Sequence, residues 1–438
     1  MADLSINLAG IKSPNPFWVA SGPPANTGYQ AHRAFEAGWG GVVWKTIGDP
    51  IVNVASRYSA LNHGKDRMIG FNNIELISDR SPETNFREIA EVKKRWPNHA
   101  VIASLMVDTR ERWHEFVKRA ADAGADGIEL NYGCPHGMCE RGMGSAVGQQ
   151  PAVAEKITSW VMEVATIPVI VKLTPNITDI TAAARAARRA GANAISLINT
   201  INSITNVNLD TFVPEPTVSG RSSHGGYCGP AVKPIALNMV QSCASDPEVG
   251  LPISGIGGIG TWRDAAEFLA LGSTSLQVCT AIMHYGFRIV EDMTEGLNAY
   301  LDSKGMKSIN ELIGRSVPTL QKWETLDLRW QRVARIDYDK CIGCNLCYIA
   351  CEDGAHQCID LKAPAELGIG LGPGRVPGKP VPKVREEDCV GCNLCSLVCP
   401  VDECITMTEI PNGERPLSWS DYQTKLAAGE MAAIPPHP

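Results

Sequence analysis

The chain has 438 residues, of which 44% are hydrophobic and 20% charged, as expected of a globular protein with a large buried core. Its formal net charge of −7 argues against nucleic-acid binding, which depends on basic residues. No apolar run approaches the roughly 18 residues of a membrane span. The first residues lack the basic end and apolar stretch of a signal peptide. We therefore expect a cytoplasmic protein of about two or three domains.

Along the first 300 residues, short apolar runs alternate with amphipathic stretches typical of helices. One such stretch, ERWHEFVKRAADAG, places Trp113, Phe116, Val117 and Ala120 on one face at helical spacing. Each apolar run is largely hydrophobic on both faces, as expected of a parallel strand that is covered on both sides. Eight strands are predicted in this way: FWVAS, GVVWKT, VIASLM, GIELN, PVIVKL, NAISLI, LPISGIGG and SLQVCT.

A turn of similar composition joins a helix to the following strand at four places: EAGWGGVVWK, DAGADGIELN, RAGANAISLI and ALGSTSLQVC. In each turn we expect the glycine to end the helix in the left-handed conformation. A doubly wound open sheet is one fold that suits such units. Eight consecutive units favour the alternative, an α/β fold closed into a (β/α)8 TIM barrel over about residues 15–300.

Barrel enzymes place their active sites at the carboxyl ends of the strands, in the loops that follow. A single lysine at a strand end is usually just solvated, but here two lysines, two asparagines and paired glycines finish strands at one rim. The loops after the seventh and eighth strands, SGIGGIGTWRDA and CTAIMHYG, suit a phosphate. GIGGIG opens no βαβ unit with a ribose-binding acid downstream, so the pattern favours FMN over NAD.

Ten of the fifteen cysteines lie between Cys341 and Cys404, which in a long cytoplasmic chain indicates metal or iron–sulfur ligation rather than disulfides. CIGCNLCYIAC and CVGCNLCSLVC both have the C-x2-C-x2-C-x3-C spacing of bacterial ferredoxins, in which the fourth cysteine of each run ligates the other cluster. Structural zinc is the alternative, disfavoured because zinc motifs typically supply two ligands per knuckle. The expected sets are Cys341, Cys344, Cys347 and Cys399 for one cluster, and Cys389, Cys392, Cys395 and Cys351 for the other.

Three other features of this region receive structural interpretations. Cys358 and Cys404 lie outside both runs and are read as small apolar core residues. The Gly- and Pro-rich segment 363–383 is read as a surface insertion. The tail after about Asn412 is expected to pack on a partner or to stay loose.

Five features are specific when taken together: FNNIELIS, LNYGCPHGMCERGMG, VKLTPN, GGYCGPAVKPIALN and the paired cysteine runs. Over about residues 1–408 they resemble the catalytic subunit of bacterial NAD-dependent dihydropyrimidine dehydrogenase and the C-terminal part of the single-chain eukaryotic enzyme. The resemblance implies an FMN-binding barrel of the dihydroorotate dehydrogenase type, followed by a bacterial-ferredoxin-like α+β domain with two [4Fe–4S] clusters. It also implies reversible reduction of uracil or thymine, with hydride from N5 of FMN and a proton from a cysteine.

The same resemblance implies roles for individual residues, with Cys134 as the acid. Their types suit these roles, since amides both donate and accept, Glu75 can accept from a ring N–H, and Lys172 can stabilise the negative charge of reduced flavin. Eukaryotic members have serine where Gly133 stands, so a hydroxyl contact is missing there. The pyrimidine would be bound by Asn73, Glu75, Asn131, Asn199 and Thr200. FMN would be held by Ala20, Ser21, Lys45, Thr46, Lys172, Gly229, Gly257, Gly258, Cys279 and Thr280.

The loop LNYGCPHGMCERGMG allows three roles for Cys134. A metal site with His136 and Cys139 would need a fourth ligand and a more rigid scaffold than this glycine-rich sequence offers. A buried structural thiol is common, but Cys134 follows the end of a strand, where barrels place chemistry. A general acid on a loop that closes over the substrate is therefore preferred.

The sequence contains no dinucleotide fingerprint, so electrons are expected from a partner subunit that carries FAD and binds NAD(H). That subunit would feed the clusters, which feed FMN, in an α2β2 heterotetramer. Two other functions are considered: a dihydroorotate dehydrogenase, disfavoured by the fused cysteine region, and a non-catalytic electron-transfer subunit, disfavoured by the pyrimidine pocket. The expected parts are a barrel over 1–310, a connecting segment over 311–333, a ferredoxin-like domain over 334–408 and a tail over 409–438.

Overall fold

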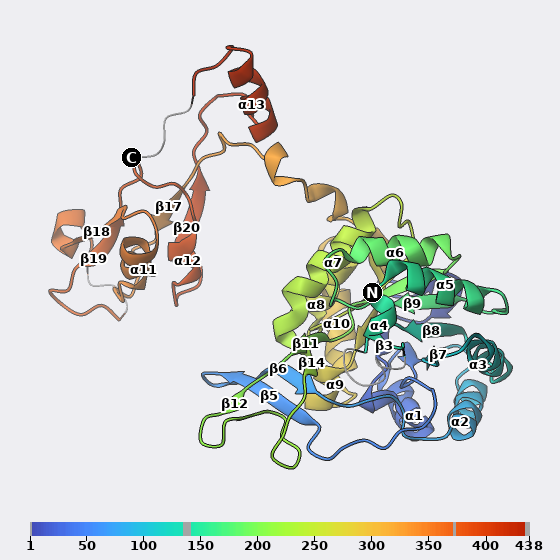
Figure 1. Ribbon diagram of the computed structural model, residues 1–438. Coiled ribbons are helices and arrows are strands. Elements are labelled where there is room, and N and C mark those ends of the chain that lie inside the picture. The colour runs from blue at the N-terminus through green and yellow to red at the C-terminus, as the bar shows by residue number, and fades with distance from the viewer. Residues whose placement is uncertain (1, 135–141, 371–373, 434–438) are drawn as a thin grey trace. The chain divides into compact units, whose positions relative to one another are not determined.

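The computed structural model describes the chain apart from residues 1, 135–141, 371–373 and 434–438. The described residues form two compact units, Met1–Leu320 and Gln321–Pro438 (Figure 1). In the part of the chain that is described, no helix combines the length and the apolar character that crossing a membrane requires.

Eight parallel strands close into a barrel in the first unit, and they follow the chain order around it. Each overlaps one of the apolar runs predicted from the sequence, although the third and eighth strands begin one and two residues earlier, and nearly every strand residue is buried. The predicted (β/α)8 barrel is therefore confirmed, and the open sheet is excluded because the last strand pairs with the first. The strands are β3 (Phe17–Val19), β4 (Gly41–Val43), β7 (Ala100–Leu105), β8 (Gly127–Asn131), β9 (Val169–Lys172), β10 (Ala194–Leu197), β15 (Ile253–Ile256) and β16 (Ser273–Val278).

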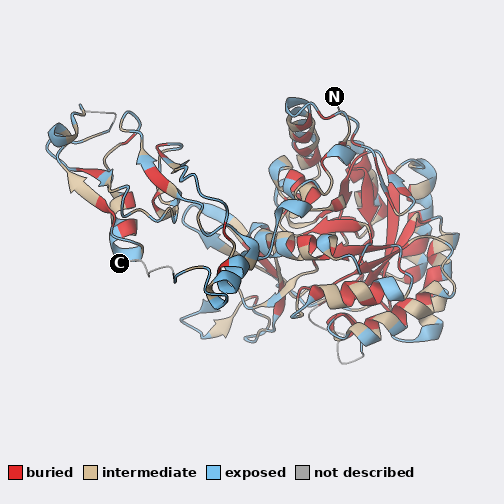
Figure 2. Cartoon of the chain, turned by 90° about the horizontal axis from the view of Figure 1, so that it is seen from above, coloured by how far each residue is buried: buried red, intermediate tan, exposed pale blue. Residues whose placement is uncertain are grey.

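Helices surround the barrel and expose their outer faces, while the strands inside are buried (Figure 2). Side chains of Thr27, Ser81, Thr109, Asp179 and Thr261 cap five of these helices by accepting a backbone N–H of the first turn. The helices are α1 (Gly28–Ala37), α2 (Pro82–Arg95), α3 (Arg110–Asp122), α4 (Ser145–Gly148), α5 (Pro151–Met162), α6 (Ile180–Arg189), α7 (Lys233–Ser245), α8 (Trp262–Ala270), α9 (Thr280–Tyr285) and α10 (Ile289–Ser303).

The four recurrent turns have the backbone that their glycines predict. Gly38, Gly124, Gly191 and Gly272 have φ of 108°, 77°, 91° and 108°, in the region that only glycine adopts without strain. The face of α3 predicted to be apolar is the face that packs against the barrel. Local sequence therefore determines where each helix ends and the next strand begins.

A second, antiparallel sheet lies next to the carboxyl end of the barrel, because its strand β11 follows almost directly after β10. This sheet was not predicted from the sequence. Its order is β11 (Ile201–Ser203), β14 (Gly225–Cys228), β6 (Asp66–Asn73) and β5 (Tyr58–His63). Two further antiparallel pairs are β1 (Ile6–Leu8) with β2 (Ile11–Ser13) and β12 (Val207–Asn208) with β13 (Val213–Pro214). Short 3-10 helices in this unit include η1 (Pro23–Ala25), η3 (Pro230–Val232), η4 (Ile309–Glu311) and η5 (Val317–Thr319).

The second unit contains two similar halves, each made of a strand, a cysteine run, a helix and a second strand. The first and last strands pair with each other, and so do the two middle strands, which interlocks the halves. The first half is β17 (Arg332–Ile336), α11 (Leu346–Gly354) and β18 (Ile359–Lys362), and the second is β19 (Val381–Val384), α12 (Leu394–Leu397) and β20 (Ile405–Glu409). Between them lies η7 (Pro364–Leu367).

The C-terminal tail packs within its own unit. Helix α13 (Trp419–Ala427) lies beside η6 (Trp323–Thr325), with the rings of Trp323 and Trp419 6.0 Å apart. The N–H of Leu328 also donates to the carbonyl oxygen of Leu417 at 2.9 Å. The tail up to this helix is therefore attached to the connecting segment through its backbone and two tryptophans.

Candidate active site

A cavity of about 600 Å3 opens at the carboxyl ends of the barrel strands. A volume of this size suits a cofactor or a small-molecule substrate. Its wall contains all the residues predicted from the barrel sequence: Ala20, Ser21, Lys45, Thr46, Asn73, Glu75, Asn131, Cys134, Lys172, Asn199, Thr200, Gly229, Gly257, Gly258, Cys279 and Thr280. The structure thus brings them together, while their individual roles stay predictions.

Two asparagines, one at the end of β8 and one just after β10, form the centre of a polar chain in this cavity. The Nδ2 of Asn199 donates to Oδ1 of Asn131 at 3.0 Å, and the Nδ2 of Asn131 donates to Oγ1 of Thr46 at 2.9 Å. The backbone N–H of Thr200 donates to Oδ1 of Asn199 at 2.8 Å. A Cβ on Gly133 would lie 2.4 Å from Asn199, so glycine at this position is what permits the arrangement. Both amides are therefore held in fixed orientations.

Glu75 contacts two cations and a hydroxyl in and beside the cavity wall. Its carboxylate pairs with Lys45, accepts from the hydroxyl of Tyr58, and lies 3.4 Å from Nη1 of Arg57. The side chain of Asn73 donates to the carbonyl oxygen of Gly226 at 2.9 Å, which fixes β6 against β14. A carboxylate has about four acceptor positions. A ring N–H of a bound pyrimidine would therefore share Glu75 with these partners.

Cys134 lies just after β8 and is buried against Ile77, Met106 and Met143. The backbone N–H of Ser145 donates to its carbonyl oxygen at 3.0 Å, which fixes the chain on the far side of the loop. His136 and Cys139, the other members of the metal site considered above, lie outside the described residues. The thiol thus lies in an apolar pocket that borders the cavity.

Three glycines form a closely packed backbone cradle between the loops after β14 and β15. Gly229, Gly257 and Gly258 have φ of 91°, 131° and 77°. A Cβ on Gly258 would lie 2.9 Å from both the carbonyl oxygen of Gly229 and the Cβ of Lys233. The Lys233 ammonium is engaged elsewhere, 2.6 Å from Asp264 and 2.9 Å from Glu267. A phosphate at this cradle would therefore meet backbone groups.

Buried polar atoms in the cavity wall fit FMN. Lys45 and Lys172 are both buried in this wall, so each offers a cation to a cofactor that gains negative charge on reduction. The Oε1 of Gln277 is buried and accepts no hydrogen bond from the residues that the structure describes. A buried acceptor without a donor is costly. A ring N–H of the cofactor would supply that donor, and FMN has one.

Burial keeps two further thiols of the cavity protonated. It raises the pKa of Cys228 to about 11, although a hydrogen bond from the Thr280 hydroxyl lowers it slightly. It raises the pKa of Cys279 to about 12, and the nearby Cys228 raises it further. Neither thiol is therefore a thiolate at neutral pH, and both act as small apolar groups.

Most of the wall that comes from the second sheet was not predicted from the sequence, including Tyr58, Met68, Tyr227 and Cys228. The hydroxyl of Tyr227 lies 1.7 Å from where a Cβ on Gly70 would be, so this glycine permits the ring to cross β6. A glycine inside a strand often marks such a close approach. Gly70 was therefore the one feature of the sequence that could have indicated this close approach.

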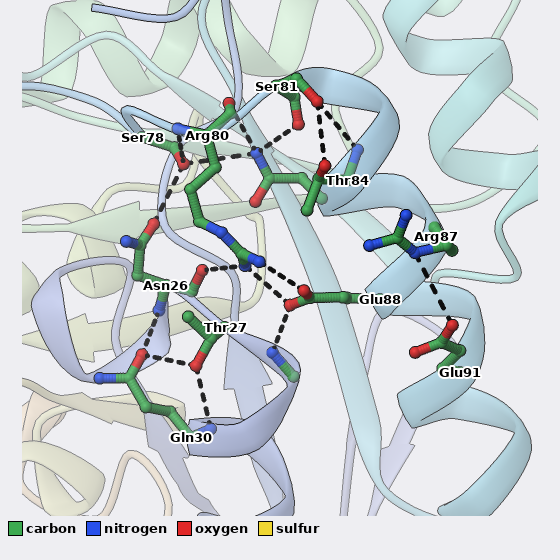
Figure 3. A network of polar contacts seen from close by, with 12 residues as sticks. Asn26, Thr27, Gln30, Ser78, Arg80, Ser81, Thr84, Arg87, Glu88 and Glu91 are labelled. Carbon is green, nitrogen blue, oxygen red and sulfur yellow. Dashed lines mark hydrogen bonds and ion pairs between the residues drawn. The ribbon is translucent and has the colours of Figure 1, made fainter. Parts of the chain in front are cut away.

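A polar network anchors the segment that carries Glu75 (Figure 3). Arg80 forms an ion pair with Glu88 of α2, and its Nη1 donates to the carbonyl oxygen of Asn26 at 3.0 Å. Glu88 also accepts the N–H of Gly28 at 2.7 Å. The Arg80 hydrogen bonds lower the pKa of Glu88 below its ordinary value, against the opposing effect of burial. Three separate parts of the chain therefore meet at one guanidinium.

In the second unit, two hollows are each surrounded by four cysteines from both runs. Ile336 and Ile405 help to line the first hollow, and Ala334 and Met407 help to line the second. This is the grouping that crossed ligation requires, and the ligand assignment stays a prediction. The first hollow contains Cys341, Cys344, Cys347 and Cys399, and the second contains Cys351, Cys389, Cys392 and Cys395.

Each hollow also contains a fifth cysteine, Cys358 or Cys404, at the residue before β18 or β20. Both are buried, as expected of small apolar core residues. The Sγ atoms of Cys358 and Cys351 are 3.6 Å apart. The Gly- and Pro-rich insertion also reaches this region, because Nε of Arg375 donates to the carbonyl oxygen of Cys341 at 2.9 Å. None of the described residues of 363–380 is buried, so the segment is a surface insertion, as predicted, that contacts the first cysteine run.

Comparison with known proteins agrees with this architecture. Residues 3–301 match the family model described as dihydroorotate dehydrogenase, and residues 334–407 match a 4Fe-4S dicluster domain. The NAD-dependent dihydropyrimidine dehydrogenase subunit PreA of Escherichia coli strain K12 is 44% identical, over 82% of this chain and 87% of the relative. The chain belongs to the family of this subunit.

Two other relatives place the family in context. The chloroplastic dihydropyrimidine dehydrogenase (NADP(+)) of Arabidopsis thaliana is 42% identical, over 72% of this chain and 77% of the relative. The catalytic subunit of dihydroorotate dehydrogenase B (NAD(+)) of Pyrococcus abyssi is 37% identical, over 71% of this chain and 98% of the relative. The expected resemblance is confirmed, and the matched families account for FMN in the barrel and two [4Fe–4S] clusters in the second unit.

Proposed function

We propose that this chain is the catalytic subunit of an NAD-dependent dihydropyrimidine dehydrogenase, which reversibly reduces uracil or thymine to the 5,6-dihydropyrimidine. One observation supports this above all: a single cavity is lined by Cys134, by the Asn131–Asn199 pair and by the buried Lys45 and Lys172. The names of the relatives from Escherichia coli and Arabidopsis thaliana point to the same activity.

Cys134 is the proposed general acid. FMN, when bound, supplies the hydride that adds to one carbon of the C5=C6 double bond. The proton on Sγ of Cys134 goes to the other carbon, which leaves a thiolate that takes a proton from water. A thiol in its neutral form carries the proton that this step needs. Hydride and proton together complete a two-electron reduction, and each step reverses for oxidation.

The pyrimidine is held by groups that match its edge. A uracil ring alternates carbonyl acceptors with N–H donors, and an asparagine amide offers both a donor and an acceptor in one plane. Asn131 and Asn199 are oriented by their mutual hydrogen bond, and Thr200 and Asn73 lie on the same wall. Glu75 accepts from a ring N–H while Lys45 balances its charge. The substrate is therefore oriented next to Cys134.

FMN is held by the remaining wall. The glycine cradle at Gly229, Gly257 and Gly258 takes the phosphate together with Cys279 and Thr280. Lys172, at the end of β9, would hold the flavin ring and stabilise its negative charge on reduction. Ala20, Ser21, Lys45 and Thr46, at the ends of β3 and β4, complete the pocket.

Electrons reach the clusters from a partner subunit with FAD and NAD(H), in a heterotetramer. The Escherichia coli relative is named a subunit, which supports the need for a second chain. The cluster ligands are the two crossed sets of cysteines, and the domain limits are those expected from the sequence. A cytoplasmic location suits thiols that must stay reduced to bind iron. If this chain alone oxidised NADH at full rate, the proposal that a partner subunit is required would be contradicted.

The central test follows flavin reoxidation. The anaerobic protein is reduced chemically, uracil is added, and the flavin absorbance is recorded for wild type and for Cys134→Ala. We expect rapid reoxidation in wild type and a loss of about 10²- to 10⁴-fold in the variant, the usual contribution of a general acid. Cys243→Ala is the matched control, because this buried thiol lies on α7 outside the cavity.

Other outcomes would select among the alternatives. Equal rates for Cys134→Ala and Cys243→Ala would make Cys134 a structural residue. Reoxidation by orotate but not by uracil would indicate a dihydroorotate dehydrogenase. Reoxidation by neither would favour an electron-transfer subunit.

A further inference from the structure

A buried carboxylate lies behind the cavity wall and has no role in the chemistry described so far. Glu129 is on β8, two residues before Asn131, and its side chain is 0% exposed. Its Oε2 accepts from Oγ of Ser196 and from Nε2 of Gln277, both at 2.9 Å. Its Oε1 accepts no hydrogen bond from any residue that the structure describes. Half of this carboxylate is therefore satisfied by hydrogen bonds and half is not.

The side of Glu129 without hydrogen bonds faces a lysine. The Nζ of Lys172 on β9 lies 3.6 Å from Oε1, and the lysine side chain is itself 7% exposed. Lys172 lines the cavity and so does Gln277, whereas Glu129 does not. The order from the barrel interior outward is thus carboxylate, then ammonium and amide, then the space for the cofactor.

Charges in this position act strongly on whatever fills the cavity. An ionised carboxylate inside a protein persists only when it is paired, because burial without a partner is very costly. Electrostatic interactions are also larger in such surroundings than in water. A cofactor that gains negative charge next to Lys172 would therefore experience the ammonium and the carboxylate behind it together.

We propose that Glu129 is a positioning residue that fixes the Lys172 ammonium at the cavity wall and offsets its charge, and so sets the midpoint potential of the FMN. The inference rests on the proposed function only in that FMN occupies this cavity. A carboxylate behind the lysine keeps the pair neutral, which limits how far the negative charge of reduced FMN is stabilised. Without Glu129, Lys172 would stabilise it fully and the FMN would become a stronger oxidant.

The test compares FMN midpoint potentials in the full chain, measured by anaerobic titration with a reference dye. Glu129→Gln is close in shape and removes one negative charge, so we expect the potential to rise. Lys172→Met removes one positive charge, so we expect it to fall. The double variant Glu129→Gln/Lys172→Met is again neutral, so we expect it to return close to wild type. An FMN potential in Glu129→Gln equal to that of wild type would overturn the inference.

Asp126→Asn is the matched control. Asp126 directly precedes β8 and pairs with Lys93 at 2.7 Å, so the same carboxylate-to-amide change is made at the other end of the strand. That strand end lies on the order of 10 Å from Glu129, and Asp126 is not in the cavity wall. We expect no change in its FMN potential. An equal rise in Asp126→Asn would overturn the inference, because it would reflect general loosening of the barrel.

Two further results keep the inference testable. If Glu129→Gln alone fails to fold, the double variant tests the proposal instead. We expect it to fold and to retain FMN. An FMN potential in the double variant as low as that of Lys172→Met alone would overturn the proposal. If uracil fails to reoxidise wild type but the potentials shift as expected, the proposed function is wrong and the charge balance stands. A wild-type chain that binds no FMN would overturn both.

Discussion

The two units of this molecule assemble their sites by different routes. In the second unit, three cysteines of each hollow lie within seven consecutive residues, and the fourth comes from the other run. In the barrel, the cavity wall runs from Ala20 to Tyr285 and takes residues from the ends of seven of the eight strands, all except β7. Residue spacing therefore defines the first kind of site, whereas chain topology defines the second.

The largest expected effect tests whether spacing alone is sufficient in the second unit. Cys399→Ser removes a cysteine of the second run. This cysteine lines the hollow whose other three predicted ligands come from the first run. Because a thiolate ligand is lost, we expect the variant to lose the cluster bound by Cys341, Cys344 and Cys347 and to retain the other. Iron content should fall by about half, and electron paramagnetic resonance of the reduced protein should show one cluster.

Cys351→Ser is the reciprocal variant, and Cys358→Ser, in the same hollow but outside both runs, is the control. We expect Cys351→Ser to lose the cluster of Cys389, Cys392 and Cys395, and Cys358→Ser to keep both. Loss of the same cluster in Cys399→Ser and Cys351→Ser would contradict crossed ligation. In every case flavin content should be unchanged, because the barrel forms its cavity from its own residues.

This difference also explains how much the sequence could predict. Eight apolar runs and four glycine turns were sufficient to predict the barrel, because hydrophobic periodicity and helix-ending glycines are local features of the sequence. The second sheet was missed because β5 and β6 are largely polar and exposed toward their turn, so no apolar pattern marks them. The partners of Glu75, Arg57 and Tyr58, were missed with it. Glu129 was read only as a strand residue, because nothing local shows that its side chain meets Lys172.

The next prediction tests the glycine cradle of the barrel site, where the backbone conformation of single residues is as important as the chain topology. Gly258→Ala places a Cβ 2.9 Å from the carbonyl oxygen of Gly229, at a φ of 77°. Both the contact and the left-handed backbone cost free energy, about 1–2 kcal/mol for the backbone alone. We expect the dissociation constant of FMN to rise about tenfold or more, measured by the fluorescence of released flavin.

Gly305→Ala is the matched control for this effect. Gly305 has a φ of 69°, and a Cβ there would have no atom within 4 Å. Gly305→Ala therefore has the free-energy cost of a left-handed backbone but no steric contact, and the position lies outside the cavity. Stability should fall slightly while FMN affinity stays at the wild-type level. Equal loss of FMN in both variants would show that general destabilisation, and not the cradle, determines binding.

The smallest expected effect concerns how the barrel holds its site residues from a distance. Glu88→Gln removes the charge that Arg80 pairs with, at a side chain only 17% exposed (Figure 3). Hydrogen bonds to charged groups contribute about 1.5–3 kcal/mol when buried. We expect the free energy of unfolding of the barrel to fall by about 1–2 kcal/mol at pH 7, measured by urea unfolding and flavin release. The segment 74–81 should loosen, so the Michaelis constant for uracil should rise more than kcat falls.

The effect of Glu88→Gln should depend on pH in a defined direction. Arg80 lowers the pKa of Glu88 in the folded chain, so its carboxylate stabilises the fold above the unfolded pKa of about 4.3. That contribution is lost as the pH falls through the lower, folded pKa. The difference in unfolding free energy between wild type and Glu88→Gln should therefore be constant from pH 7 to about 5 and shrink below about pH 4.

Glu91→Gln on the same helix separates this effect from surface charge. Glu91 pairs with Arg87 at 3.8 Å, and both side chains are 63% exposed. An exposed pair at this spacing contributes about 0.3–0.5 kcal/mol and is screened by salt. We expect Glu91→Gln to leave uracil kinetics unchanged at every pH. If Glu88→Gln behaved like Glu91→Gln, then Arg80 would be held by Asn26 alone, and the cavity would owe its shape to the strands rather than to contacts outside them.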